Sequence, residues 1–366
     1  MEHHPPGTKS HARTRTVRSR RVLWIIASIV AGVLAAGGIF YLYTLGKLPF
    51  FERAAAPAIH GKVYFAGATA AHSVPNVYLY DFDFGHFELG AGVFTNEAYV
   101  RYTTSISPSG TEIAYFNAVA ATSSAARPAT REVSLASTLQ LIRFSRDTPE
   151  EFDVRTPDAP YLKLFPEWSP DGQVILYEAY TGEADDSSTE LENWTIYRIA
   201  DEGVEETLVT GSSPKWSPDG TSFVYVRGDG VYQYTVATGS SARVLEFLEP
   251  ATWGKTRIDI SPDGTQLVLT PETKRIERYE VSSWEPFSAS LAATANRQHV
   301  RHWWPQFSPD GTQVAVIDWE QASDEPTDLR ALLAVYGATE QDPFTLLSTV
   351  SLDEFDLMAK YISDWR

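Results

Sequence analysis

The chain has 366 residues, of which 43% are hydrophobic and 21% charged, so most of it can bury a globular core. Its net charge of −17 is uneven, because residues 1–21 contain six basic side chains and one acidic one, leaving −22 on the remainder. So acidic a region lacks the basic surface of a nucleic-acid-binding protein, and no nucleic-acid partner is expected. Cysteine is absent, which excludes disulfides and thiolate metal sites.

Residues 22–43 form an uncharged apolar segment that predicts a transmembrane α-helix. As a helix this segment spans about 33 Å, enough for a hydrocarbon core of about 30 Å. Basic residues precede it, whereas only Lys47 and Arg53 follow closely, so the positive-inside rule places residues 1–21 in the cytoplasm. A cleaved signal peptide would have a shorter apolar region, and a buried helix would not need one-sided charge. We therefore expect a single-pass signal anchor in the cell membrane, contacting the lipid bilayer through residues 22–43.

A repeated tetrapeptide dominates the rest of the sequence. Ser-Pro-Asp-Gly ends at four glycines, and a Ser-Pro-Ser-Gly variant ends at Gly110. The successive glycines are 62, 48, 44 and 47 residues apart, a spacing typical of β-propeller blades. Proline suits turn position i+1, glycine supplies a positive φ, and serine and aspartate bond nearby backbone amides. Structural turns are therefore assigned to Asp171 and Gly172, Asp219 and Gly220, Asp263 and Gly264, and Asp310 and Gly311.

Each tetrapeptide follows a bulky residue and precedes a short apolar strand, and a second strand comes later. Residues 61–66 and 76–81 match the later strands of this unit, and residues 361–365 match its first strand. Pairing of the two chain ends would remove two exposed sheet edges. We therefore expect an all-β fold over residues 60–366, a six-bladed β-propeller with four-stranded antiparallel blades. Five blades would be complete, one would be assembled from both ends, and residues 44–59 would form a linker.

These turns and strands resemble the TolB-type, WD40-like propeller repeat, in which an aromatic-Ser-Pro-Asp-Gly turn lies between short aromatic-rich strands. The resemblance covers about residues 60–366 and implies a six-bladed propeller of the kind found in periplasmic TolB and prolyl-oligopeptidase-like peptidases. The sequence departs from both relatives. No α/β domain of the TolB kind is expected before the propeller, and the G-x-S-x-G elbow of the peptidases does not occur.

One cluster of basic and aromatic residues is the candidate site for a ligand or partner. Its members are Arg297, His299, Arg301, His302, Trp303 and Trp304. We expect this cluster just before the first strand of a blade, in a connection on the face opposite the Ser-Pro-Asp-Gly turns. Variable loops on a rigid scaffold often carry function, and tryptophan and arginine are frequent in binding hot spots. The alternatives are packing of a tryptophan between blades, and a metal site, for which no third ligand is evident.

The sequence contains no phosphate-binding loop and no dinucleotide fingerprint, so no catalytic residue, metal or cofactor is assigned. We expect a non-catalytic scaffold outside the cytoplasm that binds a protein, peptide or cell-envelope ligand. The alternative is a glycan- or peptide-processing hydrolase whose carboxylates pair in the propeller funnel. Funnel carboxylates with a raised pKa would favour the enzyme, whereas an aromatic and basic pocket would favour binding.

Overall fold

The computed structural model describes most of the predicted propeller. The described residues are 58–67, 76–89, 99–100, 103–119, 137–144, 149–153, 163–182, 190–200, 204–248, 250–251, 256–271, 276–286, 299–321, 329–338, 343–353 and 361–366. Within these ranges, no helix combines the length and apolar character needed to cross a bilayer. The predicted transmembrane segment, residues 22–43, lies outside them.

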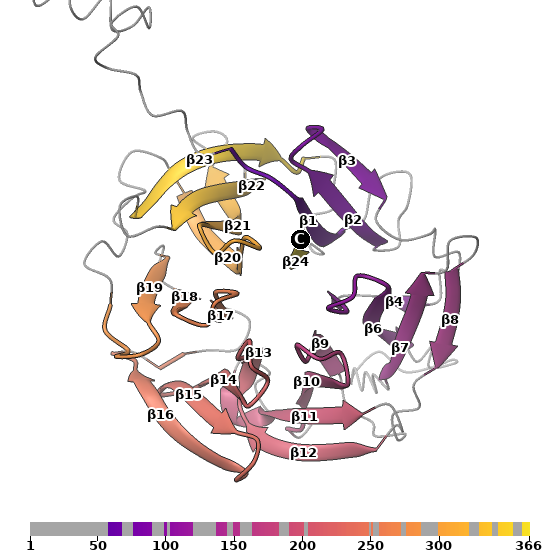
Figure 1. The fold of residues 1–366 in the computed structure, drawn as a ribbon, viewed down its shortest axis with the longest axis vertical. Helices are drawn as coiled ribbons and strands as arrows, with labels where there is room; N and C mark the ends of the chain where they lie inside the picture. The colour runs from indigo at the N-terminus through magenta and orange to yellow at the C-terminus, as the bar shows by residue number, and fades with distance from the viewer. Residues whose placement is uncertain are drawn as a thin grey trace, which may run out of the picture. The chain divides into compact units, whose positions relative to one another are not determined.

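The described strands form six antiparallel sheets arranged in a ring around a common centre (Figure 1). Sheet 1 contains β24 (Tyr361–Trp365), β1 (Lys62–Gly67), β2 (Asn76–Asp81) and β3 (His86–Leu89). Sheet 2 contains β4 (Tyr99–Val100), β5 (Thr104–Ile106), β6 (Glu112–Val119), β7 (Ser137–Phe144) and β8 (Pro149–Asp153). Sheet 3 contains β9 (Lys163–Trp168), β10 (Val174–Tyr180), β11 (Trp194–Ala200) and β12 (Glu205–Thr210), with a 3-10 turn η1 (Leu191–Asn193) before β11.

The other three sheets follow in chain order. Sheet 4 contains β13 (Ser212–Trp216), β14 (Ser222–Arg227), β15 (Gly230–Thr235) and β16 (Ser240–Glu246). Sheet 5 contains β17 (Arg257–Ile260), β18 (Gln266–Thr270) and β19 (Glu277–Glu280). Sheet 6 contains β20 (His299–Phe307), β21 (Gln313–Gln321), β22 (Leu329–Ala338) and β23 (Pro343–Ser351).

The expected propeller of four-stranded antiparallel blades is confirmed, but the number of complete blades differs. Five sheets contain four or more described strands and form complete blades. Sheet 5 contains three described strands, and beyond β19 it continues only as an isolated bridge between Tyr279 and Pro286. The described residues therefore give five complete blades where six were expected.

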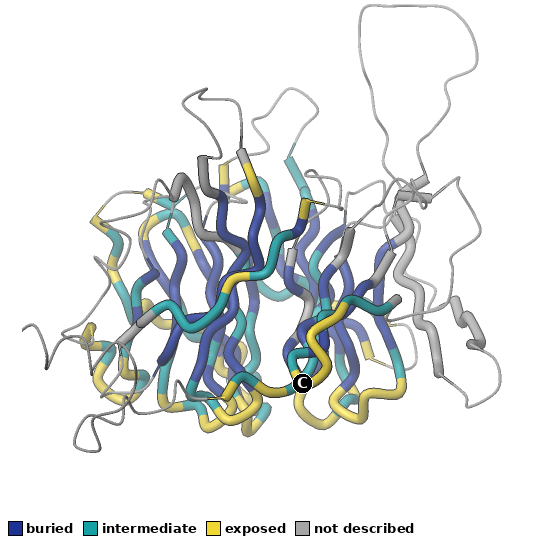
Figure 2. Tube along the Cα trace, turned by 90° about the horizontal axis from the view of Figure 1, so that it is seen from above, coloured by how far each residue is buried: buried dark blue, intermediate teal, exposed yellow. Residues whose placement is uncertain are grey.

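The four Ser-Pro-Asp-Gly turns have the same geometry. Each turn joins the innermost strand of its sheet to the next strand, and its glycine has a φ between 68° and 72°. The serine Oγ donates to the aspartate Oδ1 at 2.6 Å in every copy. A backbone N–H two residues later donates to the same oxygen at 2.9–3.1 Å. These turns are exposed along the lower side of the ring in Figure 2, which we call the turn face.

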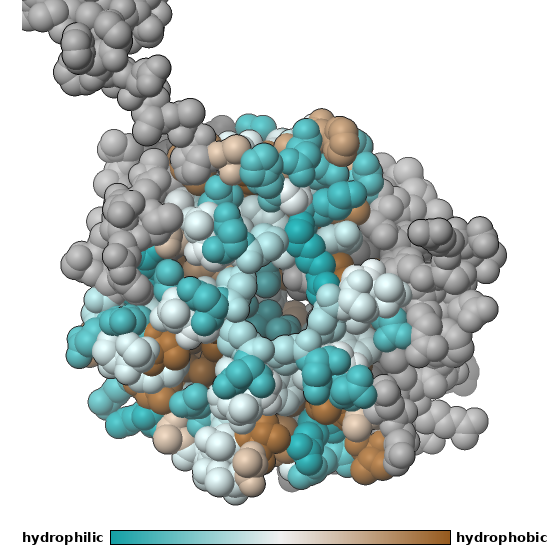
Figure 3. All heavy atoms as spheres, in the orientation of Figure 1, coloured by the Kyte–Doolittle hydropathy of each residue, from teal (hydrophilic) through white to brown (hydrophobic). Residues whose placement is uncertain are grey.

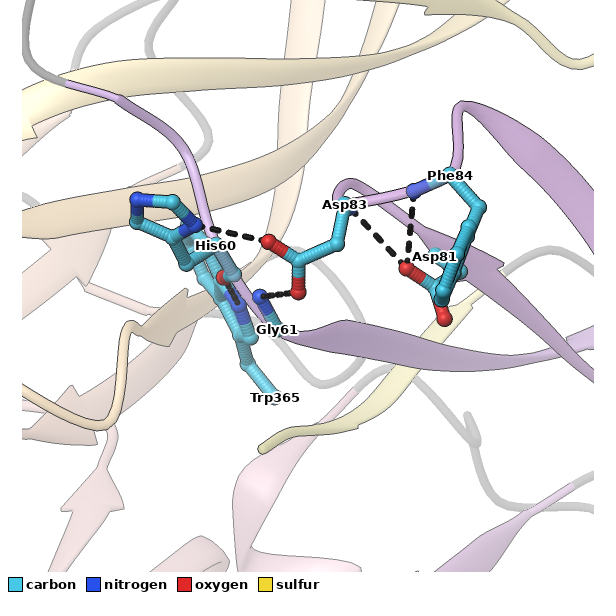
Figure 4. A network of polar contacts seen from close by, with 6 residues as sticks. All are labelled: His60, Gly61, Asp81, Asp83, Phe84 and Trp365. Atoms are coloured by element: carbon cyan, nitrogen blue, oxygen red, sulfur yellow. Dashed lines mark hydrogen bonds and ion pairs between the residues drawn. The ribbon is translucent and has the colours of Figure 1, made fainter.

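The two ends of the propeller meet in sheet 1, as the sequence predicted. Strand β24 pairs antiparallel with β1, and the Arg366 N–H donates to the Lys62 carbonyl at 2.9 Å. The indole N–H of Trp365 donates to the His60 carbonyl at 3.0 Å (Figure 4). The Asp83 carboxylate accepts from the Gly61 N–H at 3.2 Å and lies 2.7 Å from His60 Nδ1. Backbone and side-chain contacts together hold the closing strand in place.

Arg366 also connects this closure to the neighbouring sheet. Its guanidinium donates to the carbonyl oxygens of Ile106 at 2.7 Å and Pro108 at 3.0 Å, both in the first turn region of sheet 2. A charged donor makes a stronger hydrogen bond than a neutral one. The closing strand therefore joins sheet 6, sheet 1 and sheet 2 in sequence around the ring.

Apolar side chains are buried between neighbouring sheets, and five neighbouring pairs of sheets each share a described core cluster. Ala114 and Phe116 of sheet 2, for example, pack with Trp168 and Tyr177 of sheet 3. Equivalent clusters join sheets 3 and 4, 4 and 5, 5 and 6, and 6 and 1. Full burial of one large apolar side chain contributes about 1.5–3 kcal/mol. This arrangement leaves the innermost strands to line the channel.

Candidate functional site in the central channel

Three innermost strands carry the same irregularity where they line the channel. Phe165, Ser213 and Trp304 each precede a proline and have φ values of 54°, 55° and 60°. At each of them the pairing with the next strand shifts register, which defines a β-bulge. Proline has no N–H for the ladder, and a bulge redirects the side chain of its strand. A positive φ costs a non-glycine residue about 1–3 kcal/mol, so strain is concentrated at the channel.

Two of these bulges bring aromatic rings together across the channel. The ring centroids of Phe165 and Trp304 are 4.9 Å apart and the planes are tilted by 33°, although their sheets, 3 and 6, lie opposite each other in the ring. The guanidinium carbon of Arg257, from sheet 5, lies 4.0 Å from the Phe165 centroid and 4.4 Å from the Trp304 centroid. A desolvated cation–π contact contributes about 2 kcal/mol. We call these three residues the channel cluster.

A fully buried carboxylate supports the channel cluster. Glu178 Oε1 accepts from Arg257 Nη1 at 3.1 Å, and its Oε2 accepts from the Ser213 N–H at 2.8 Å. Burial lowers the pKa of Arg257, whereas the Glu178 carboxylate opposes that shift. Arg257 stays protonated, as arginine does in proteins. Glu178 therefore connects sheet 3 to the bulge of sheet 4 and to the cluster arginine of sheet 5.

Charged residues also occupy one equivalent position in sheets 3, 4 and 5. Lys215 Nζ lies 3.0 Å from Glu167 Oε2 and 3.6 Å from Asp259 Oδ1. The other oxygen of Asp259 accepts from the Phe307 N–H of sheet 6 at 2.8 Å. Because each contact crosses from one sheet to the next, this row of alternating charge fixes the spacing of four innermost strands.

A cavity of about 50 Å³ lies beside the channel cluster. Besides the cluster, its lining includes Pro166, Pro214, Pro305, Glu167, Lys215 and Gln306. These residues follow the bulges in their strands, so they lie between the cluster and the turns. Figure 3 shows the turn face hollowed at its centre, where the innermost strands meet. We call this cavity the channel pocket. One water molecule needs about 10–15 Å³, so the cavity has room for the end of a ligand.

The structure places the predicted binding residues differently from the sequence. Arg297 lies outside the described residues, whereas His299, Arg301, His302, Trp303 and Trp304 all belong to β20. The expectation that they precede the first strand of the blade is therefore wrong. Strand β20 begins at His299, and two register shifts in its pairing with β21 conceal the strand from a simple alternating pattern. Among the side chains described, that of Trp304 is half-buried in the channel cluster, not in a loop on the opposite face.

Sequence reasoning did not find Phe165, Glu178, Lys215 or Arg257. One signal was available, because Pro166, Pro214 and Pro305 each stand three residues before a turn serine. Among the residues that the structure describes, no group of three or more His, Asp or Glu side chains could hold a metal ion.

Comparison with known proteins supports the fold. The chain resembles TolB from Acinetobacter baumannii with a TM-score of 0.51 at 17% identity, over 83% of this chain and 66% of that one. It also resembles a putative TolB from Agrobacterium tumefaciens, with a TM-score of 0.46 at 15% identity, over 80% of this chain and 90% of that one. The chain thus spans just under two thirds of the Acinetobacter protein.

In sequence, an uncharacterized protein of Agrobacterium fabrum is 35% identical over 80 residues, which cover 20% of this chain and 27% of that protein. No protein-family profile matches the chain. At these identities the likeness concerns architecture alone: the chain has a β-propeller fold of the TolB type.

Proposed function

We propose that this protein is a non-catalytic scaffold whose channel pocket binds a group of a protein, peptide or cell-envelope ligand. The supporting observation is an aromatic lining with fixed charges of both signs, in which Phe165 and Trp304 adjoin Arg257, and Lys215 is paired with Glu167. Binding pockets commonly combine apolar walls with a few fixed polar groups. Backbone strain at two cluster residues also favours a functional role, because strained residues gather at ligand sites.

We propose the turn face as the route of entry, in place of the opposite face. The channel cluster spans the channel, and the pocket residues Glu167, Lys215 and Gln306 lie on its turn-face side. Contact through Arg297, which lies outside the described residues, and Arg301 is the competing location.

A hydrolase is the alternative function, and the pocket supports it less well. A general acid must hold a proton that it can donate. Glu167 and Asp259 both lie near the Lys215 ammonium, which stabilises a carboxylate in its charged form. This geometry suits a fixed ion pair rather than a proton donor.

A site-specific crosslinking experiment tests the proposed location. A photo-crosslinking amino acid at Gln306, inside the pocket, should form a discrete adduct in intact cells, and Trp304→Ala should remove that adduct. The same amino acid at Leu248, which is fully exposed at the outer end of sheet 4, is the control. Adducts from Leu248 that survive Trp304→Ala, with none from Gln306, would place binding elsewhere.

We also propose that residues 22–43 anchor the propeller in the cell membrane, with residues 1–21 in the cytoplasm. The uncharged 22-residue length and the preceding basic residues support this arrangement. Protease added to spheroplasts should digest the propeller and spare an N-terminal tag. Protection of the propeller, with permeabilised spheroplasts as the control, would contradict the orientation.

We further propose that sheet 5 is the sixth blade of the ring. It packs against sheets 4 and 6 through apolar clusters of the same kind as the complete blades. An experimental structure in which sheet 5 has no fourth strand would contradict this proposal.

A further inference from the structure

The channel cluster lines one end of the channel pocket. Phe165 and Trp304 meet from opposite sheets, and Arg257 packs against both rings. From Pro166 to the turn residue Ser169 the strand rises about 10 Å, at about 3.3 Å per residue. A ligand group arriving from the turn face therefore travels about one turn-to-bulge length to reach the cluster rings.

The base of the pocket already holds a planar cation. The Arg257 guanidinium packs against both aromatic rings at 4.0 and 4.4 Å, so these rings already take part in cation–π contacts. Aromatic faces carry negative partial charge and attract cations, with tryptophan the strongest. Trp304 is only half-buried, so part of its side chain is accessible to solvent.

The wall of the pocket has two carboxylates around one ammonium. Lys215 contacts Glu167 at 3.0 Å and Asp259 at 3.6 Å. The Asp259 side chain is 5% exposed and is fixed by the Phe307 N–H, whereas Glu167 is 23% exposed and lines the cavity. If Glu167 turned towards an incoming cation, Lys215 would still keep Asp259 as a partner.

The residues around the turn-face opening of the channel pocket also favour a positively charged ligand. The turns carry four exposed aspartates at equivalent positions: Asp171, Asp219, Asp263 and Asp310. The chain after residue 21 carries −22. A cleft surrounded by charge of one sign concentrates ligands of the opposite sign.

We propose that the channel pocket binds the side-chain end of a lysine or arginine from a partner protein, with the cation against Trp304 and paired with Glu167. This inference rests on the proposed function and adds the chemical class of the ligand. Trp304 provides the aromatic surface and Glu167 provides the negative charge. Asp259 remains paired with Lys215 when Glu167 turns to the ligand.

Small probes test the charge preference directly. Methylguanidinium chloride, butylammonium chloride and sodium acetate would be titrated into the full-length protein, with binding followed by NMR of the one indole signal that Trp304→Phe removes. Both cations should bind at millimolar concentration, and acetate should not. Glu167→Gln should weaken cation binding at least fivefold. The matched control is Glu206→Gln, which removes a carboxylate paired with Arg198 on the outermost strand of the same sheet.

A second pair of variants keeps the test independent of the folding of Glu167→Gln. Gln306→Lys places a tethered cation in the pocket and should abolish cation binding, whereas Gln306→Glu should strengthen it. Preferential binding of acetate, no binding of either cation, or equal cation binding by the two Gln306 variants would overturn the charge assignment. The proposed function would stand in that case if the crosslink from Gln306 still formed and still required Trp304.

Discussion

Phe165 and Trp304 pack against each other across the central channel from opposite sheets, with 4.9 Å between their ring centroids. The Glu178–Arg257 contact joins sheets two positions apart, whereas this pair joins two sheets that are three positions apart in either direction. The contact exists because both residues stand at a bulge before a proline, where the side chain is turned into the channel.

Truncation of either ring should lower the free energy of unfolding by about 2 kcal/mol, since both side chains are only partly buried. The double variant Phe165→Ala/Trp304→Ala should cost less than the sum, with a coupling energy of about 0.5–1.5 kcal/mol. Urea denaturation of the two single variants and the double variant measures this term. Strict additivity would mean that the rings do not interact in solution.

Glu178 supplies a second prediction, because it is fully buried and accepts from both Arg257 and Ser213. Glu178→Gln leaves the buried Arg257 charge without its counter-ion and should cost about 3–5 kcal/mol. Adding Arg257→Met should recover much of that loss, because an apolar side chain of similar length can replace the buried pair.

The surface pair of Arg198 with Glu206 is the control for this comparison, since Glu206 is about half exposed. Glu206→Gln should change the free energy of unfolding by less than about 1 kcal/mol. Equal effects of Glu178→Gln and Glu206→Gln in chemical denaturation would refute a central role for the buried pair.

Ring closure by β24 gives a third prediction. Deletion of residues 361–366 exposes an edge of β1 and removes the Arg366 contacts to sheet 2, so the protein should self-associate. Light scattering after size-exclusion chromatography measures this association. Trp365→Phe keeps most of the packing, loses the hydrogen bond to His60, and should cost only about 1 kcal/mol. A deletion variant that stays monomeric and melts like the parent would show that closure does not need β24.

The turn aspartates predict a loss of stability in acid. Hydrogen bonds from the turn serine lower the pKa of Asp171 and Asp219. At Asp263 and Asp310 partial burial acts to raise the pKa, but the same kind of hydrogen bond still leaves it below the usual value. A pKa lowered on folding stabilises the protein above the unfolded value of 3.8. That stabilisation is lost as the pH falls through the folded pKa.

The free energy of unfolding would be measured between pH 5 and pH 2 for the parent protein and for Asp219→Asn. This pH range brackets the unfolded aspartate pKa of about 4. The asparagine variant should be less stable at pH 5 and should lose less stability on acidification. Identical slopes for the two proteins would mean that the Ser217 hydrogen bond does not favour the charged aspartate.

Much of the scaffold could be predicted because its signals are local. A Ser-Pro-Asp-Gly turn specifies its own hydrogen bonds within a few residues, so four turns and the adjoining strands were found from sequence. Closure by residues 361–365 was also predictable, because an unpaired first strand at one end matched an incomplete unit at the other.

The channel was harder to predict because its contacts join distant residues. Glu178 and Arg257 are 79 residues apart, and no local pattern indicates which blade will supply a buried partner. The stretch from His299 to Trp304 does not have the alternating pattern expected of a strand, because bulges shift its register. The recurrent proline after each bulge residue is visible in the sequence, but only the observed strand pairing connects it to the channel.

Filling the channel pocket tests the central claim most directly. Gln306→Trp should occupy the cavity beside Trp304, and Leu248→Trp adds the same side chain at an exposed position outside it. The affinity of each variant for the partner crosslinked through Gln306 would be measured by calorimetry, after confirming an unchanged melting temperature. We predict at least a tenfold loss of affinity for Gln306→Trp and no change for Leu248→Trp. Full affinity of a folded Gln306→Trp protein would show that the ligand does not use the channel pocket.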